Sequence, residues 1–112
     1  MGFAINIGHS WDSVALHFNP RFDEQTIVCN SYEEGSWQSE QRESSLPFRV
    51  QEEFKVTMEF NDKEFHIKLP SGQKIQFPNR FGDKEFKNVH VTGDVKIKDI
   101  KTIEEIHHMR QT

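Results

Sequence analysis

Apolar and polar side chains alternate along several short stretches of this chain. The first long stretch covers residues 13–22, and its apolar positions include Val14, Leu16 and Phe18. Successive side chains of a β-strand project to opposite faces, so these three residues are expected on one face. The polar positions between and after them are expected together on the opposite face, and they are His17, Asn19 and Arg21.

The following stretch, residues 26–31, repeats this pattern. It places Ile27 and Cys29 on one face and Val28 and Asn30 on the other. A second polar pair, also two residues apart, is expected to project together: Glu40 and Arg42. The polar face of the first stretch is therefore expected to continue across neighbouring strands.

Alternation continues in the second half of the chain. It predicts a hairpin formed by residues 54–60 and 65–69 around a turn at Asn61-Asp62. Further short strands are expected, separated by turns rich in Pro, Gly and Asn, at 75–77, 89–91 and 95–97. Short strands joined by tight turns about every eight to twelve residues predict an all-β fold, an antiparallel sandwich of two sheets.

The predicted polar face has the chemistry of a sugar-binding site. A neutral sugar carries hydroxyls that donate and accept hydrogen bonds, so its site needs donors such as Arg and Asn beside acceptors such as Glu. A sugar also offers an apolar patch of C–H bonds, and an aromatic ring such as that of Trp37 can cover it.

Three segments resemble, in order and spacing, the carbohydrate-recognition signature of the galectins, which bind β-galactosides. They are His17-Phe18-Asn19-Pro20-Arg21, Val28-Cys29-Asn30 and Trp37-Gln38-Ser39-Glu40-Gln41-Arg42. The similarity is to the prototype vertebrate members and extends from about Phe3 to Lys101, through Pro47-Phe48, Lys68-Leu69-Pro70, Phe77-Pro78-Asn79-Arg80 and Gly93-Asp94-Val95-Lys96-Ile97-Lys98. It implies a two-sheet jelly roll and a carbohydrate-recognition domain over residues 1–101, with no cofactor.

The resemblance also implies which residues contact the ligand, namely His17, Asn19, Arg21, Val28, Asn30, Trp37, Glu40 and Arg42. The first three would hold the axial 4-hydroxyl of galactose, and Trp37 would stack on the apolar face of the ring. Asn30 and Glu40 would take the 6-hydroxyl, Glu40 and Arg42 would reach the neighbouring sugar, and Val28 is a minor contact. Since each hydrogen bond nets about 1 kcal/mol, a single disaccharide is expected to bind in roughly the micromolar to millimolar range.

The chain departs from the family pattern in three places. Only residues 3–8 precede the signature, so two strands of the sandwich are expected to be missing. Those strands form the dimer interface in prototype members; their absence weighs against an ordinary homodimer and would leave exposed sheet edges. The segment 22–26 is short and lacks a loop contact that is often a His, and residues 102–112 form a tail that suits a short helical turn or a frayed end.

Composition and charge weigh against two other classes of protein, nucleic-acid-binding and membrane-spanning proteins. The 112 residues fit one domain, and 14 basic against 18 acidic residues give a net charge of −4, so the basic footprint of a nucleic-acid-binding protein is missing. No apolar run approaches the ~20 residues of a membrane-spanning helix, and the N-terminal residues lack a signal-peptide pattern. A cytoplasmic location is expected, and the resemblance adds export to the extracellular space by a non-classical route.

Several of these residues admit other interpretations. The one cysteine, Cys29, is expected as a buried apolar residue, with oxidation that perturbs the site as a secondary hypothesis. Adjacent His107 and His108 do not face one another on a helix, so no metal is expected. A glycosidase needs a paired carboxyl group that Glu40 lacks, so no enzyme is expected. The stronger rival is a protein-interaction scaffold that binds no sugar, which Trp37→Ala would distinguish.

Overall fold

A computed structural model describes residues 2–47 and 54–93 of the chain. The described residues contain nine strands and no helix. The strands are β1 (Phe3–Ser10), β2 (Ser13–Arg21), β3 (Thr26–Glu33), β4 (Ser36–Trp37), β5 (Gln41–Glu43), β6 (Thr57–Phe60), β7 (Glu64–Lys68), β8 (Lys74–Pro78) and β9 (Asn88–Gly93).

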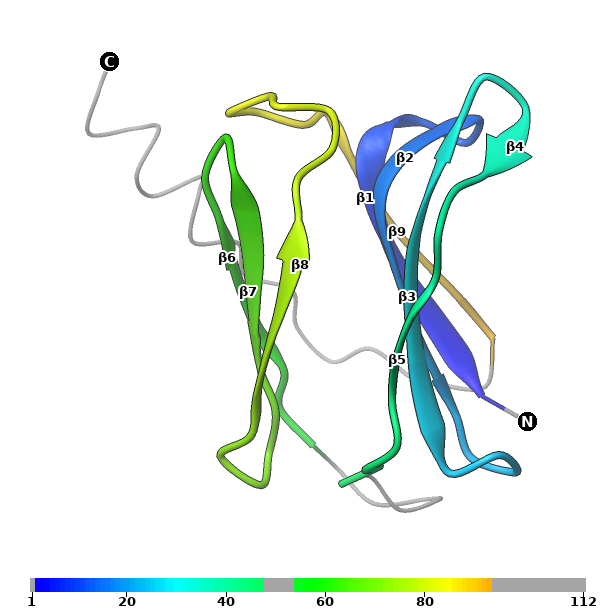
Figure 1. The fold of residues 1–112 in the computed structure, drawn as a ribbon, viewed down its shortest axis with the longest axis vertical. Helices are drawn as coiled ribbons and strands as arrows, with labels where there is room; N and C mark the ends of the chain where they lie inside the picture. Colours follow the sequence, from blue (N-terminus) through cyan, green and yellow to red (C-terminus); the bar gives the residue numbers. More distant parts are fainter. Residues whose placement is uncertain (1, 48–53, 94–112) are drawn as a thin grey trace.

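The strands form two antiparallel sheets that face each other (Figure 1). The larger sheet has the order β4-β3-β2-β1-β9, and β5 also pairs with β3. The smaller sheet has the order β6-β7-β8. The predicted all-β sandwich of two antiparallel sheets is therefore confirmed.

The core lies between the two sheets and follows the alternation of the sequence. From the larger sheet it includes Leu16, Phe18, Ile27 and Cys29, and from the smaller sheet Phe65, Ile67, Ile75 and Phe77, all buried. Burying each such side chain contributes about 1.5–3 kcal/mol relative to leaving it in water. Since the core uses one face of β2 and β3, their other face is left for the polar side chains.

Val14 is the exception to the predicted alternation. The register of β1 and β2 shifts between Ile7 and Gly8, so that Ile7 lies opposite Leu16 but Gly8 lies opposite Val14, and Ala15 is the extra residue of a β-bulge. The prediction that Val14 shares the face of Leu16 is therefore wrong. Val14 is buried outside the core cluster, whereas Ala15 belongs to that cluster.

The predicted hairpin of the smaller sheet is confirmed, with a shorter first strand. Strand β6 begins at Thr57, not at residue 54, and pairs with β7. The side-chain oxygen of Asn61 accepts hydrogen bonds from the backbone N–H groups of Lys63 and Glu64, which closes the turn. The predicted strand at 95–97 and the tail at 102–112 lie outside the described residues and stay predictions.

Candidate functional site

The predicted site residues lie on the outer face of the larger sheet, on four strands and one loop. In the strand register, His17 of β2 lies opposite Asn30 of β3. In a neighbouring row, Asn19 lies opposite Val28, which in turn lies opposite Arg42 of β5. Residues directly opposite one another in adjacent strands have Cβ atoms about 5 Å apart. Three short polar segments of the sequence therefore meet on one surface.

Trp37 forms one end of this surface. It is the last residue of β4 and lies opposite Tyr32 near the end of β3, and its ring contacts that of Tyr32 edge-on at 5.0 Å between centroids. The ring of His17 lies 4.7 Å from it, tilted by 58°. Trp37 is nevertheless 53% exposed, although a Trp of a soluble domain is highly buried on average. Its flanking rings fix its orientation while part of its apolar surface stays open to a ligand.

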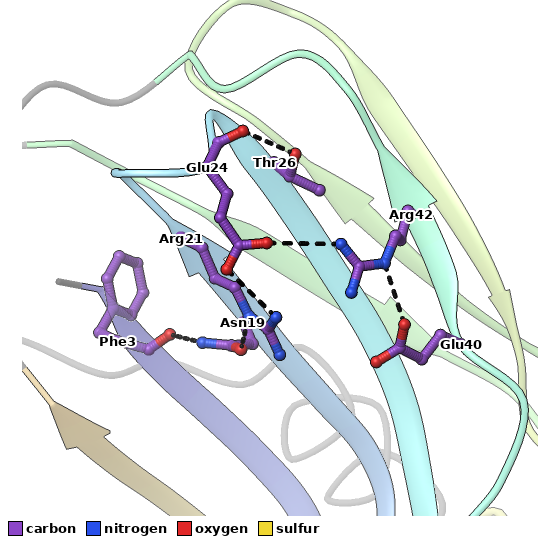
Figure 2. Close-up of polar contacts among 7 residues, drawn as sticks. All are labelled: Phe3, Asn19, Arg21, Glu24, Thr26, Glu40 and Arg42. Carbon is purple, nitrogen blue, oxygen red and sulfur yellow. Dashed lines mark hydrogen bonds and ion pairs between the residues drawn. The ribbon is translucent and has the colours of Figure 1, made fainter.

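Asn19 and Arg21 lie together on β2, and Figure 2 shows their polar contacts with neighbouring residues. The Asn19 amide donates to the carbonyl of Phe3 on β1 at 2.7 Å, and its oxygen accepts from Nε of Arg21 at 2.8 Å. This bond holds the guanidinium of Arg21 beside Asn19 through Nε. Its terminal nitrogens remain for other acceptors.

Glu24 joins Arg21 and Arg42, although the sequence pattern did not predict it as part of the site. It lies in the turn after β2, where its carboxylate lies 3.3 Å from Nη1 of Arg21 and 3.5 Å from Nη1 of Arg42 (Figure 2). Arg42 also donates from Nε to Glu40 at 2.9 Å, and this bond is the main reason that the pKa of Arg42 is raised. All four side chains are substantially exposed, so these ion pairs orient the groups more than they stabilise the fold. The short loop at 22–26 thus supplies one acidic side chain, which contacts both arginines of the site.

Asn30 is held by Arg80, a second residue that the strand pattern could not identify as part of the site. Arg80 follows β8, and its Nη1 donates to Oδ1 of Asn30 at 3.2 Å and to Oγ of Ser31 at 2.9 Å. Its Nη2 donates to the carbonyl of Ser39, next to Glu40, at 2.8 Å. The Asn30 amide also donates to the carbonyl of Gln38 at 2.9 Å. Its Oδ1 also accepts from the backbone N–H of Ser31 at 2.8 Å, so one Nδ2 hydrogen is the part of this 4% exposed amide that is left for a ligand.

His17 is half-buried and has a defined partner on β1. Its Nδ1 lies 2.6 Å from the side-chain oxygen of Asn6. Burial of the ring, with a smaller contribution from the charge of Arg21, lowers the pKa of His17 below its ordinary value of 6.5. The ring is therefore a neutral imidazole at neutral pH, with one donor and one acceptor nitrogen.

A shallow depression of about 410 Å³ lies beside this surface, toward β1 and β9. His17, Asn19 and Arg21 line it, whereas Trp37, Glu40 and Arg42 lie outside it on the open part of the sheet. All eight predicted residues therefore belong to one face, but only part of that face is hollowed. Two of them, Val28 and Asn30, are almost fully buried under their neighbours.

Residues 2–47 and 54–93 contain no group of three or more His, Cys, Asp or Glu side chains that could hold a metal ion. No helix within those ranges has the length and apolar character needed to span a membrane. Cys29 is fully buried, and burial raises the pKa of its thiol to about 12. His107 and His108 lie outside the described residues, so the prediction about them stays untested.

Comparison with known proteins places this geometry in a family. The family model described as galactoside-binding lectin matches residues 1–102. Galectin-2 of Homo sapiens is 44% identical over 100 residues, which cover 89% of this chain and 76% of that protein. The β-galactoside-binding lectin of Electrophorus electricus is 44% identical over 103 residues, covering 88% of this chain and 75% of its own length.

Solved structures agree with the sequence comparison. The crystal structure of the Dario rerio galectin-1-L2 has a TM-score of 0.87 and 45% identity, covering 89% of this chain and 79% of that one. CG-16, a homodimeric agglutinin from chicken liver, has a TM-score of 0.83 and 38% identity, with coverage of 89% and 78%. Fold, site face and sequence all lead to one assignment, and the chain belongs to the galectin family.

Proposed function

We propose that the chain is a lectin that binds β-galactosides such as lactose and N-acetyllactosamine without any chemical reaction. The observation that carries this proposal is the set of polar atoms left without protein partners on one face of the described sheet. They include Nε2 of His17, Nη2 of Arg21 and Nη2 of Arg42, beside the open ring of Trp37. Donors and acceptors fixed next to an exposed aromatic ring match the hydroxyls and the C–H patch of a pyranose.

The roles proposed for the individual residues are those that the resemblance to the galectins implies. His17, Asn19 and Arg21 surround the place of the 4-hydroxyl, and an epimer with this hydroxyl in another direction would leave some of these groups unpaired. Trp37 stacks on the sugar ring. Asn30 donates its remaining Nδ2 hydrogen to the 6-hydroxyl, and the carboxylate of Glu40 accepts the hydrogen of that hydroxyl. Arg42 reaches the second sugar, while Val28 supports the surface from beneath.

The experiment that tests this proposal is retention of the purified, reduced protein on immobilised lactose. We expect elution with free lactose but not with sucrose. The variant Trp37→Ala should flow through, because the stacking surface is lost. Its matched control is Trp11→Ala, which removes the other tryptophan, 86% exposed in the turn between β1 and β2 and outside the proposed site. Folded wild-type protein that flows through, or equal retention of both variants, would contradict the proposal.

The rival interpretation is a protein-interaction scaffold without sugar binding. Under that interpretation the exposed Trp37 would contact a protein partner, and the polar atoms around it would have no common ligand. Retention on lactose separates the two, since a scaffold has no affinity for the disaccharide.

The proposal also excludes glycoside hydrolysis. On this face the carboxylates of Glu24 and Glu40 both form ion pairs with the guanidinium of Arg42, whereas hydrolysis needs one carboxyl group that donates a proton to the leaving sugar.

A further inference from the structure

Asn6 lies next to the proposed site but is not among the residues predicted to contact the ligand. On β1 it is in register with His17 of β2 on one side and with His90 of β9 on the other. Its Nδ2 donates to the backbone carbonyl of His90, at 3.4 Å. Its Oδ1 lies 2.6 Å from Nδ1 of His17. The side chain therefore bridges the edge strand β9 and the imidazole ring.

These two contacts determine which nitrogen of His17 carries the proton. A backbone carbonyl can only accept a hydrogen bond, so the amide must turn its NH₂ group toward His90 and its oxygen toward His17. That oxygen is an acceptor, so Nδ1 of His17 must be the donor. A neutral imidazole has one N–H, which leaves Nε2 as an acceptor with a lone pair.

The rest of the surroundings of His17 favour the same state. The ring of Trp37 on β4 packs at 4.7 Å and restricts rotation of the imidazole. Burial and the nearby charge of Arg21 lower the pKa of His17, which disfavours a second proton. Within the described residues, Nε2 makes no hydrogen bond. The ring thus offers one acceptor to the surface.

We propose that Asn6 is a positioning residue that fixes the tautomer of His17, so that the site accepts a hydrogen bond at Nε2 from a ligand hydroxyl. This inference rests on the proposed function and specifies its ligand chemistry. The hydroxyl that meets His17 must donate its hydrogen there, and its oxygen remains free to accept from Arg21. A fluorine at the same sugar position can accept weakly but cannot donate, so a 4′-fluoro analogue of lactose lacks the bond that His17 requires.

The first test measures the tautomer directly, without sugar. Long-range proton–nitrogen NMR spectra of ¹⁵N-histidine-labelled protein at pH 8 distinguish protonated from bare ring nitrogens. For the wild type we expect His17 to carry its proton on Nδ1. Asn6→Leu has similar volume but no acceptor, so the proton should move partly or wholly to Nε2. Asn6→Asp keeps an oxygen acceptor and should retain the wild-type tautomer. A wild-type spectrum with the proton on Nε2, or no change in Asn6→Leu, would overturn the proposal.

The second test measures binding of lactose and of 4′-deoxy-4′-fluorolactose by calorimetry. Wild type and Asn6→Asp should bind lactose at least about tenfold more tightly than the fluoro analogue. Asn6→Leu should bind lactose about fivefold more weakly than the wild type, the loss expected for one hydrogen bond. Its preference for lactose over the fluoro analogue should be smaller than that of the wild type. Thermal unfolding of each variant shows whether it is folded. If Asn6→Leu does not fold, the wild-type spectrum and the preference of Asn6→Asp for lactose still test the role of Asn6.

The two proposals fail in different ways. If the wild type binds no lactose, the proposed function fails, whereas the tautomer spectrum still tests the role of Asn6. If the wild type binds lactose, but the wild type, Asn6→Leu and Asn6→Asp all discriminate equally against the fluoro analogue, the role of Asn6 is refuted and the lectin function stands.

Discussion

Arg80 connects the loop after β8 to the face of the larger sheet that carries the proposed sugar-binding site. Its guanidinium reaches Asn30, Ser31 and Ser39 and also lies 4.8 Å above the buried ring of Phe77. A planar fork with several donors is needed for this set of contacts, and a lysine ammonium cannot reproduce it. Although Arg80 is not among the predicted ligand contacts, it therefore orients both Asn30 and the loop that carries Glu40.

We predict that Arg80→Lys lowers lactose affinity about fivefold and Arg80→Ala about tenfold or more, as expected for the loss of one or two hydrogen bonds to a partly buried amide. Calorimetric titration measures the effect. Lys68→Ala removes an exposed cation from β7 on the other sheet and serves as the control. Unchanged affinity in Arg80→Ala would show that Asn30 keeps its orientation without this contact.

His17 is predicted to make lactose binding insensitive to pH near neutrality. Because its pKa is lowered from 6.5, the ring should stay neutral as pH falls from 8 to 6.5, and affinity should decrease only at lower pH, when Nε2 becomes protonated. The same shift makes its contribution to stability decrease as pH falls below 6.5, since the unfolded chain takes up the proton first. Affinity measured from pH 8 to 5 checks this, and a decrease that begins above pH 6.5 would contradict it.

Cys29 is predicted to be unreactive in the folded protein. Its thiol lies in the core with a pKa raised to about 12, so the thiolate needed for attack is scarce at neutral pH. Ellman's reagent at pH 8 should label it only after denaturation. Stability should also decrease as pH rises above the ordinary thiol pKa of 9.0, because the unfolded chain then loses a proton that the folded chain keeps. Rapid labelling of native protein would refute this and revive the oxidation hypothesis.

At the level of elements, the alternation of apolar and polar residues was enough to predict most of the architecture. It located the central strands β2 and β3, their core faces and the hairpin of β6 and β7. It could not predict the β-bulge at Ala15, because a bulge depends on the register with a neighbouring strand and not on the strand's own pattern. For the same reason it missed Asn6, Glu24 and Arg80, whose roles depend on contacts between segments distant in sequence or in a turn.

The β-bulge leads to a prediction about the stability of a variant at Gly8. A Cβ atom at this position would collide with the carbonyl oxygen of Ser13 and crowd the backbone of Val14. Gly8→Ala should therefore lower the free energy of unfolding by about 1–3 kcal/mol, the usual cost of forcing a backbone shift. Urea denaturation measures it, with Lys68→Ala as an exposed strand control. A change below about 0.5 kcal/mol would mean that the bulge relaxes without cost.

At the level of the whole molecule, the described residues provide one face with the proposed sugar-binding site. A single weak site gives little retention on a cell surface, whereas two linked sites bind a multivalent surface far more tightly. Two copies joined by a flexible Gly/Ser linker should bind lactose-coated surfaces about 10²-fold or more tightly than one copy, with unchanged affinity for free lactose. Surface plasmon resonance compares them, and equal binding to the surface would show that the linked sites cannot engage together.

Domain limits, oligomeric state and location stay predictions. Residues 1–101 are expected to form the carbohydrate-recognition domain, with the tail at 102–112 outside it. The chain covers about three quarters of the length of the relatives it matches. A homodimer is described for CG-16, and sedimentation equilibrium would show whether this chain forms one. A cytoplasmic location with non-classical export can be tested by expressing the tagged full chain in cells.

Binding of lactose beside Trp37 can be observed by an NMR titration of the ¹⁵N-labelled chain, through its two indole N–H signals. Trp37 lies on the proposed site, and Trp11 lies in the turn between β1 and β2 outside it. We predict that the Trp37 signal shifts in a saturable way with lactose and not with sucrose, while the Trp11 signal stays in place. A Trp37 signal that does not respond to lactose in folded protein would contradict the account.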